Sequence, residues 1–444
     1  MQRELRPGGG SFRSLSSAIR HPTFTPAVIV LSGCLISMIG FGPRSALGFF
    51  LTPLSQAHGW GREVFALSVA VQTLLYGAAQ PFSGAIADRF GTVRVIIAGT
   101  LLYAAGLFMM AHATTPGMLY LSSGVLIGFG LSGCSFNLVI SSFGKLLPES
   151  WRSLAFGAGT AAGSFGQFLF SPLGVSLIDV FGWQRALEIF AALLLLMIPL
   201  AFAISTPRSD APQTSGSAPR TNDAPPTPAR KLDGLSGVRP TQSYRQALAE
   251  ALGHRSYILL VLGFFTCGFQ LGFVTLHLPS YLIDRGLSAQ VGGWTLGVIG
   301  LFNIVGAMLS GWLGGRMPKR YILAAIYFAR ALAVVFLITL PASPAVALIY
   351  GAMTGLLWLS SVPPTAGLVA VMFGTRWMAM LFGIAFFSHQ VGGFLGIYLG
   401  GALFERTGSY DIVWWLGVLF GVLSAVINLP IVEKPVARLA PAPA

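Results

Sequence analysis

Long runs of predominantly apolar residues recur along the whole chain, and they limit its fold more than any other feature. Each run is long enough for an α-helix to cross the ~30 Å hydrocarbon core of a bilayer. We place twelve of them, at residues 26–50, 62–87, 93–112, 117–143, 152–179, 184–205, 257–283, 291–314, 321–340, 344–372, 377–403 and 410–432. Because backbone polar groups in lipid need partners within the protein, spans of this kind are helices. The sequence therefore predicts an all-α polytopic membrane protein.

The composition agrees with a membrane protein. Of the 444 residues, 54% are hydrophobic and only 9% are charged, whereas about a quarter of a soluble protein is charged. The three cysteines all fall within predicted spans, and their spacing indicates neither disulfides nor a metal site. We expect no metal and no cofactor. The first apolar run is too long for a signal-peptide core and no cleavage site follows it, so we expect it to be retained.

The net charge of +13 could indicate a nucleic-acid partner, but the positions of the basic residues indicate a membrane instead. Of the 27 Lys and Arg residues, 21 fall on one face of the predicted spans and 4 on the other, while Arg44 and Arg330 lie within spans. Such asymmetry is the positive-inside pattern. We predict that both termini are cytoplasmic, that the protein resides in the bacterial cytoplasmic (inner) membrane, and that it does not bind nucleic acid.

A polar stretch at residues 206–256 divides the chain into two halves. It is rich in Pro, Ser, Asp and Thr, and most of it cannot bury enough apolar surface to fold. We therefore predict five segments: a cytoplasmic N-terminal segment (1–25), a six-helix bundle (26–205), a cytoplasmic linker with a short interfacial helix (206–256), a second six-helix bundle (257–432) and a cytoplasmic tail (433–444).

The two halves repeat each other at an offset of 226 to 227 residues. SGAIADRFGTVR, starting at Ser83, aligns with SGWLGGRMPKR, starting at Ser310, and GQFL at Gly166 aligns with GGFL at Gly392. This self-similarity indicates an internal duplication. In transporters built from two repeats, the substrate site lies between them near the bilayer midplane.

The stretch GAIADRFGTVR resembles the motif between helices 2 and 3 of the major facilitator superfamily. The residues that match its pattern are Gly84, Asp88, Arg89, Gly91 and Arg94. In the second copy Gly315 replaces the aspartate, and Arg316 keeps a basic residue. The resemblance implies two pseudo-symmetric six-helix bundles, and an Asp and Arg that gate the cytoplasmic side. The alternative is a solvated turn that caps the second helix.

A second resemblance lies in the first span. GPRSALGFF is similar to the corresponding stretch of monocarboxylate porters, and the residues that follow resemble bacterial porters related to them and to the oxalate/formate exchangers. Arg44 takes the place of the lysine that contacts the substrate carboxylate in those porters.

An arginine near the middle of a bilayer costs at least about 2.5 kcal/mol, and no Asp or Glu lies in the centre of any predicted span. In a water-filled cavity, Arg44 could hold a carboxylate through two charge-assisted hydrogen bonds. The alternative is an arginine that snorkels to the interface.

Other polar residues within the spans are further candidates for contacts with the substrate. The internal offset places Gln270 opposite Arg44, Asn137 lies at mid-depth in the fourth span, and His389 and Gln390 lie near the middle of the eleventh. For each of them the alternative is a hydrogen bond between packed helices.

Two histidines are candidates for proton coupling, because histidine is the side chain that titrates near neutrality unaided. These are His389 and His277. Arg330, central in the ninth span, is a second candidate charge or a snorkelling residue. Eukaryotic-type monocarboxylate porters carry an Asp and an Arg on helix 8, where this chain has Asn303 and Ala307. Proton symport and anion exchange therefore both stay open.

The leading hypothesis is a secondary transporter, not an enzyme, that moves a small organic anion, a monocarboxylate first of all, as a monomer and by alternating access. The chain has no phosphate-binding GKS/T loop, so ATP is not expected. An exporter of a neutral or amphiphilic compound is the alternative. Two remote readings are an intramembrane protease, from the GLSG at residues 130–133, and a solute sensor. The twelve-span layout disfavours the first, and short polar tails without room for a signalling domain disfavour the second.

Overall fold

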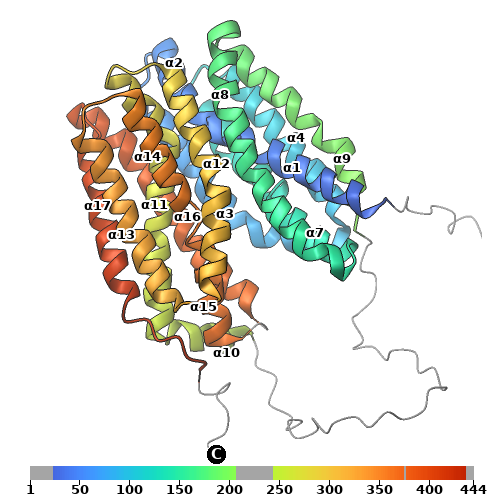
Figure 1. The fold of residues 1–444 in the computed structure, drawn as a ribbon. Coiled ribbons are helices and arrows are strands. Elements are labelled where there is room, and N and C mark those ends of the chain that lie inside the picture. Colours follow the sequence, from blue (N-terminus) through green and yellow to red (C-terminus); the bar gives the residue numbers. More distant parts are fainter. Residues whose placement is uncertain (1–23, 207–243, 375–376, 437–444) are drawn as a thin grey trace, which may run out of the picture.

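The computed structural model describes residues 24–206, 244–374 and 377–436, and it contains helices but no strand within them (Figure 1). The first half comprises α1 (Pro26–Ala46), α2 (Leu51–His58), α3 (Arg62–Phe90), α4 (Thr92–Ala111), α5 (Pro116–Leu119), α6 (Ile127–Gly133), α7 (Phe136–Leu146), α8 (Glu149–Leu195) and α9 (Met197–Ala203). The second half comprises α11 (Arg255–Asp284), α12 (Ala289–Gly314), α13 (Lys319–Thr339), α14 (Pro344–Leu357), α15 (Val362–Phe373), α16 (Met378–Thr407) and α17 (Asp411–Asn428), preceded by the short α10 (Tyr244–Leu252). The all-α membrane fold predicted from the sequence is confirmed.

Within the described residues, eleven helical stretches are long and apolar enough to cross a membrane. One of them, Gly157–Ala203, contains two predicted spans. The 47 residues of α8 would form a rod about 70 Å long if they were straight. They are not, because Gly182 breaks the helix with φ 80° and ψ 162°. The two sides of this break account for the fifth and sixth of the twelve predicted crossings.

The two halves form bundles that stand side by side (Figure 1). Equivalent helices pack most tightly in each: α1 against α8, and α11 against α16. Glycines permit these contacts, since a Cβ atom at Gly166 would lie 2.4 Å from the Met38 carbonyl oxygen. A Cβ atom at Gly396 would lie 2.2 Å from the carbonyl oxygen of Phe269. These close approaches are the ones that small residues allow between membrane helices.

Most of the interface between the halves is made by two helix pairs, α3 with α16 and α8 with α12, and α2 also contacts α11. The halves meet near α2, which we call the outer end after the sidedness predicted from the sequence, and α7 and α15 diverge at the opposite, cytoplasmic end (Figure 1). The short helix predicted before the seventh span corresponds to α10. Most of the predicted N-terminal segment, linker and tail lie outside the described residues.

Two membrane helices are interrupted at equivalent positions of the repeat. In the first half, α6 ends at Gly133 and α7 begins at Phe136. In the second, α14 ends at Leu357 and α15 begins at Val362. The second break falls at two adjacent prolines, Pro363 and Pro364, which stand in the first turn of α15, where backbone N–H groups have no partner within the helix in any case. No proline marks the first break.

Candidate binding site between the two halves

A cavity with two adjoining lobes lies between the halves. The first, here called the hydroxyl lobe, has a volume of about 610 Å³ including its opening and is lined by Ser37, Ser135, Thr160, Ser164 and Asn303, among others. The second, the aromatic lobe, has a volume of about 950 Å³ including its opening, and its walls include Val69, Leu271, Leu276, Trp358, Phe386 and Ile397. The residues that line both lobes are Phe41, Arg44, Tyr76, Gln167 and Leu359.

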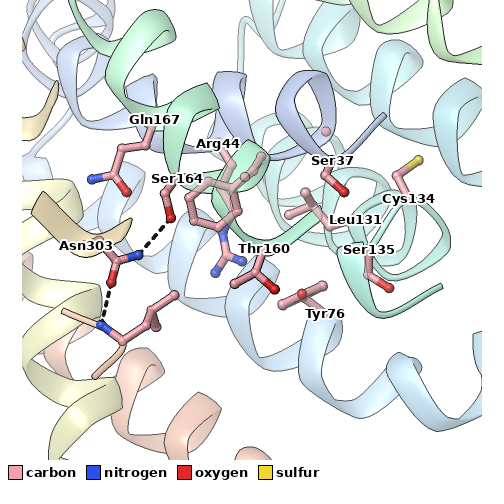
Figure 2. A pocket seen from close by; sticks show the side chains of 14 residues that line it. Ser37, Arg44, Tyr76, Leu131, Cys134, Ser135, Thr160, Ser164, Gln167 and Asn303 are labelled. Atoms are coloured by element: carbon pink, nitrogen blue, oxygen red, sulfur yellow. Dashed lines mark hydrogen bonds between the residues drawn. The ribbon is translucent and has the colours of Figure 1, made fainter. Parts of the chain in front are cut away.

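Arg44 lies where the two lobes meet. It is half-buried in the last turn of α1. Its Cζ atom lies 4.8 Å from the centre of the Tyr76 ring. Figure 2 shows the guanidinium projecting into the hydroxyl lobe near Thr160. No carboxylate of the described residues forms an ion pair with it, as the absence of acids from the span centres predicts.

His389 and Gln390 line the aromatic lobe together with Arg44. The amide of Gln390 donates to the Thr73 carbonyl of the first half at 3.2 Å. Its Oε1 atom lies 3.0 Å from Nδ1 of His389, and an amide oxygen only accepts, so Nδ1 carries the proton. The imidazole stacks on Phe386, with ring centres 5.7 Å apart. The eleventh span thus contributes an imidazole to the cavity that also contains the arginine of the first span.

Arg330 does not line the cavity. Its side chain is buried, and Nε donates to the Leu357 carbonyl at 3.0 Å while Nη2 donates to the carbonyls of Leu357 and Trp358. These carbonyls lie at the C-terminus of α14, where the helix break leaves them without backbone donors. The candidate charge of the ninth span is therefore a cap on the broken tenth span.

Asn303 holds the same break from the other side and does line the hydroxyl lobe. Its Oδ1 atom accepts from the backbone N–H of Leu359 at 2.9 Å, and its Nδ2 atom donates to the Ser164 hydroxyl at 2.9 Å (Figure 2). Ser164 belongs to α8 of the first half, so the Asn303 side chain joins the two halves at the wall of the hydroxyl lobe. A charged partner is not needed for this role, which is consistent with Asn in place of Asp.

Two predicted site residues lie elsewhere. Gln270 does not line either lobe: its amide donates to the Gly417 carbonyl at 2.9 Å, because this face of α11 packs against α17. The offset between the repeats predicted the depth of Gln270 in the membrane span, but not which neighbouring helix its side chain faces. Asn137 is exposed just beyond the break before α7, and it donates to Oε1 of Gln80 at 3.3 Å. Its neighbour Ser135 lines the hydroxyl lobe instead.

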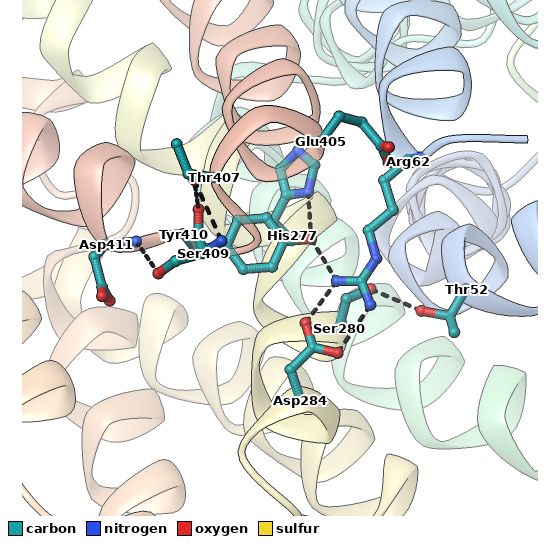
Figure 3. Close-up of polar contacts among 10 residues, drawn as sticks. All are labelled: Thr52, Arg62, His277, Ser280, Asp284, Glu405, Thr407, Ser409, Tyr410 and Asp411. Carbon is teal, nitrogen blue, oxygen red and sulfur yellow. Dashed lines mark hydrogen bonds and ion pairs between the residues drawn. The ribbon is translucent and has the colours of Figure 1, made fainter.

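His277 is also outside the cavity, fully buried near the outer end. Its Nε2 atom lies 2.8 Å from the Ile397 carbonyl oxygen, and its Nδ1 atom lies 3.3 Å from the Tyr410 hydroxyl (Figure 3). A carbonyl only accepts, so Nε2 donates and a neutral His277 accepts from Tyr410 through Nδ1. Burial raises the pKa of Tyr410 to about 12, although Arg62 beside it acts in the opposite direction. The hydroxyl therefore keeps its proton at neutral pH.

Arg62, which the sequence did not single out, joins the two halves at the outer end. Its guanidinium donates to both oxygens of Asp284, at 2.6 and 2.8 Å, and to the Tyr410 hydroxyl at 3.0 Å (Figure 3). It also lies over the ring of Phe404, 4.0 Å from the centre. Its backbone N–H donates to the carboxylate of Glu405 at 2.5 Å. The sequence offered only one indication of this role: Arg62 is the first residue of the second predicted span, at its outer end.

The gate motif is described in part. Gly91 follows the last residue of α3 and has φ 90°. Glycine adopts this conformation more readily than other residues, which explains why a glycine stands at this point of the turn. Gly84 lies within α3 and has open space around it, and Arg94 is exposed on α4. In the second copy, the guanidinium of Arg316 lies 3.8 Å from the centre of the Trp312 ring. The side chains of Asp88 and Arg89 lie outside the described residues, so their gating role stays a prediction.

Comparisons with known proteins point to one transporter family. The sequence profile of the Major Facilitator Superfamily matches residues 33–397. The uncharacterized MFS-type transporter YcxA of Bacillus subtilis is 27% identical over 89% of this chain and 92% of its own. Monocarboxylate transporter 13 of Rattus norvegicus is 26% identical over 86% and 83%.

Solved structures share the fold. A bacterial homolog of the human lysosomal transporter Spinster, in an inward-facing and occupied conformation, has a TM-score of 0.67 at 14% identity, and the alignment covers 91% of this chain and 97% of the other. A D-xylose–proton symporter has a TM-score of 0.65 at 15% identity, covering 92% and 97%.

Proposed function

This chain belongs to the Major Facilitator Superfamily, and from that premise we propose that it is a secondary transporter of a small organic anion, a monocarboxylate first of all. It works as a monomer by alternating access, in the cytoplasmic membrane and with both termini on the cytoplasmic side. An exporter of a neutral or amphiphilic compound is the competing function, and the experiment below separates the two.

The observation that carries the proposal is the position of Arg44. A half-buried guanidinium projects into a cavity between the halves, and no described carboxylate neutralises it. Within a bilayer such a charge is costly unless water or an anion solvates it. A substrate carboxylate matches the planar fork of the guanidinium with two parallel hydrogen bonds. Relatives that bear the name monocarboxylate transporter support the same substrate class.

Contacts between the halves support an inward-facing state. At the outer end, Arg62 pairs with Asp284, and the hydroxyls of Thr52 and Ser280 lie 3.1 Å apart. Deeper, Asn303 donates to Ser164. Rocking of the halves must break the outer contacts to open the cavity on that side.

Two modes of coupling fit this site: symport of the anion with a proton, and exchange of one anion for another. His389 shares the aromatic lobe with Arg44, so a proton on this imidazole would add a second positive charge to the cavity that receives the anion. In that case the protein is a proton symporter. If His389 carries no coupling proton, Arg44 alone binds one anion after another, and the protein is an exchanger.

A ligand screen by thermal shift tests the proposed function. The purified protein is heated with millimolar pyruvate, lactate, succinate, glucose or a quaternary ammonium compound, because a bound ligand stabilises the folded protein. We expect monocarboxylates to raise Tm, and Arg44→Gln to remove that shift while Arg185→Gln, on the exposed outer surface, retains it. Stabilisation by the uncharged or cationic compounds alone would support the exporter.

A further inference from the structure

The two lobes that meet at Arg44 differ in chemistry, and this difference describes the substrate more closely. From it we infer that the substrate is a monocarboxylate with a bulky apolar body of aromatic size and a hydroxyl or carbonyl group beside the carboxylate. The inference rests on the proposed function, since it takes Arg44 to bind the carboxylate.

The aromatic lobe is suited to an apolar body. Its walls are aliphatic and aromatic side chains, and Phe386 meets Tyr76 edge-on with ring centres 6.4 Å apart. Most hydrogen-bonding groups there already have partners: the Gln390 amide donates to Thr73, and the Ser45 hydroxyl donates to the Gly42 carbonyl at 2.6 Å. An acid of two or three carbons would leave this surface in contact with water. A phenyl or branched side chain would cover it, and burying apolar surface is favourable.

The hydroxyl lobe contains an unpaired polar group. Ser37 is 2% exposed, and its hydroxyl has no hydrogen-bond partner among the described residues. It stands seven residues before Arg44 on α1, close to two helical turns, so both side chains lie on the same face of the helix. Gly40, between them on α1, also lines the lobe. A buried hydroxyl without a partner is unfavourable, and an oxygen of the substrate would provide one.

The cavity offers one fixed cation. Among the described residues that line the two lobes, Arg44 is the only Lys or Arg. Arg330 donates to the carbonyls of the helix break and does not line either lobe. A second carboxylate would therefore be buried without a cation, which is strongly unfavourable. Because Arg44 is the only fixed cation there, we expect a dicarboxylate to bind more weakly than a monocarboxylate of the same size.

Four ligands test the inference on the purified full-length protein: lactate and 3-phenylpropionate each lack one group of 3-phenyllactate, and phenylsuccinate adds a second carboxylate to 3-phenylpropionate. Their dissociation constants are measured by titration calorimetry for 3-phenyllactate, 3-phenylpropionate, lactate and phenylsuccinate. We expect 3-phenyllactate to bind most tightly, by about tenfold or more over lactate, which lacks the ring, and over 3-phenylpropionate, which lacks the hydroxyl. Phenylsuccinate, which carries a second carboxylate, should bind weakest.

Variants at Ser37 and Phe386 locate the two preferences. Ser37→Ala should abolish the advantage of 3-phenyllactate over 3-phenylpropionate and leave the advantage over lactate. Phe386→Leu, which keeps an apolar side chain and so the fold, should reduce the advantage over lactate and leave the hydroxyl preference. Phe386→Tyr serves as a second variant that retains the ring and should retain the preference for 3-phenyllactate.

The outcomes separate this inference from the proposed function. If lactate binds as tightly as 3-phenyllactate and Arg44→Gln weakens both, the bulky substrate class is wrong and the carboxylate site stands. If Ser37→Ala leaves the hydroxyl preference intact, the assignment of the hydroxyl lobe is wrong. If none of the four acids binds, or Arg44→Gln changes no affinity, the proposed function itself fails.

Discussion

Arg62 and Asp284 form a bidentate ion pair that joins the first half of the protein to the second, with N–O distances of 2.6 and 2.8 Å. The two side chains are 15% and 32% exposed, so water weakens the pair and its net stabilisation is small. Its importance lies in its position. In the proposed alternating-access cycle, a contact between the halves at the outer end forms in the inward-facing state and breaks in the outward-facing one, so it shifts the balance between the two states.

Removal of this ion pair should open the outer end. In Asp284→Asn the guanidinium of Arg62 loses its charged partner, and we expect the outward-open state to become more populated. The readout is the rate at which a membrane-impermeant maleimide labels the variant Ser280→Cys. In the native protein the Ser280 hydroxyl lies 3.1 Å from the Thr52 hydroxyl across the interface between the halves. Labelling should accelerate several-fold. The control is Asp411→Asn, near the same surface, and equal rates in all three backgrounds would mean that the pair is not part of the outer closure.

Arg330 should behave as a structural cap and not as a substrate ligand. Arg330→Ala leaves the carbonyls of Leu357 and Trp358 without donors, at a cost of about 1–3 kcal/mol for each buried group. We expect a lower Tm and a lower maximal uptake rate, with similar proportional losses for all transported carboxylates. Arg330→Lys should recover part of the stability. A variant that folds with normal Tm yet no longer binds carboxylates would place Arg330 in the substrate site instead.

His389 should determine any pH dependence of uptake. If its imidazole carries the coupling proton, uptake by the wild-type protein depends on pH, because that proton adds a positive charge to the lobe that receives the anion. His389→Gln, which retains a hydrogen-bonding side chain beside Gln390, should flatten this pH profile. Initial uptake rates measured with the pH equal on both sides of the membrane give the profile. An unchanged curve would remove His389 from coupling.

The fold was largely predictable because lipid leaves few solutions to a chain of this composition. The positions of the spans followed from runs of apolar residues, and the family from the motif around Asp88 together with the internal repeat. Arg44 was found for a similar reason: a cation within a span without an acid nearby needs a polar environment, and a cavity provides it.

The directions of polar side chains were not predictable to the same extent. The offset between the repeats located Gln270 at the height of Arg44, yet its amide turns to α17, because the rotation of a helix depends on neighbours that the sequence does not reveal. The break before Phe136 had no proline to mark it, only a glycine-rich stretch. Arg62 and Asp284 are 222 residues apart, and no local pattern connects them.

Uptake by Arg44 variants tests the central claim most directly. Wild-type protein, Arg44→Gln, Arg44→Lys and the exposed control Arg185→Gln are reconstituted in liposomes at equal density, and exchange of a radiolabelled monocarboxylate against the same internal acid is followed. We predict loss of exchange in Arg44→Gln, partial activity in Arg44→Lys, which keeps the charge without the planar fork, and full activity in the control. Exchange at the wild-type rate by a correctly inserted Arg44→Gln would contradict the account.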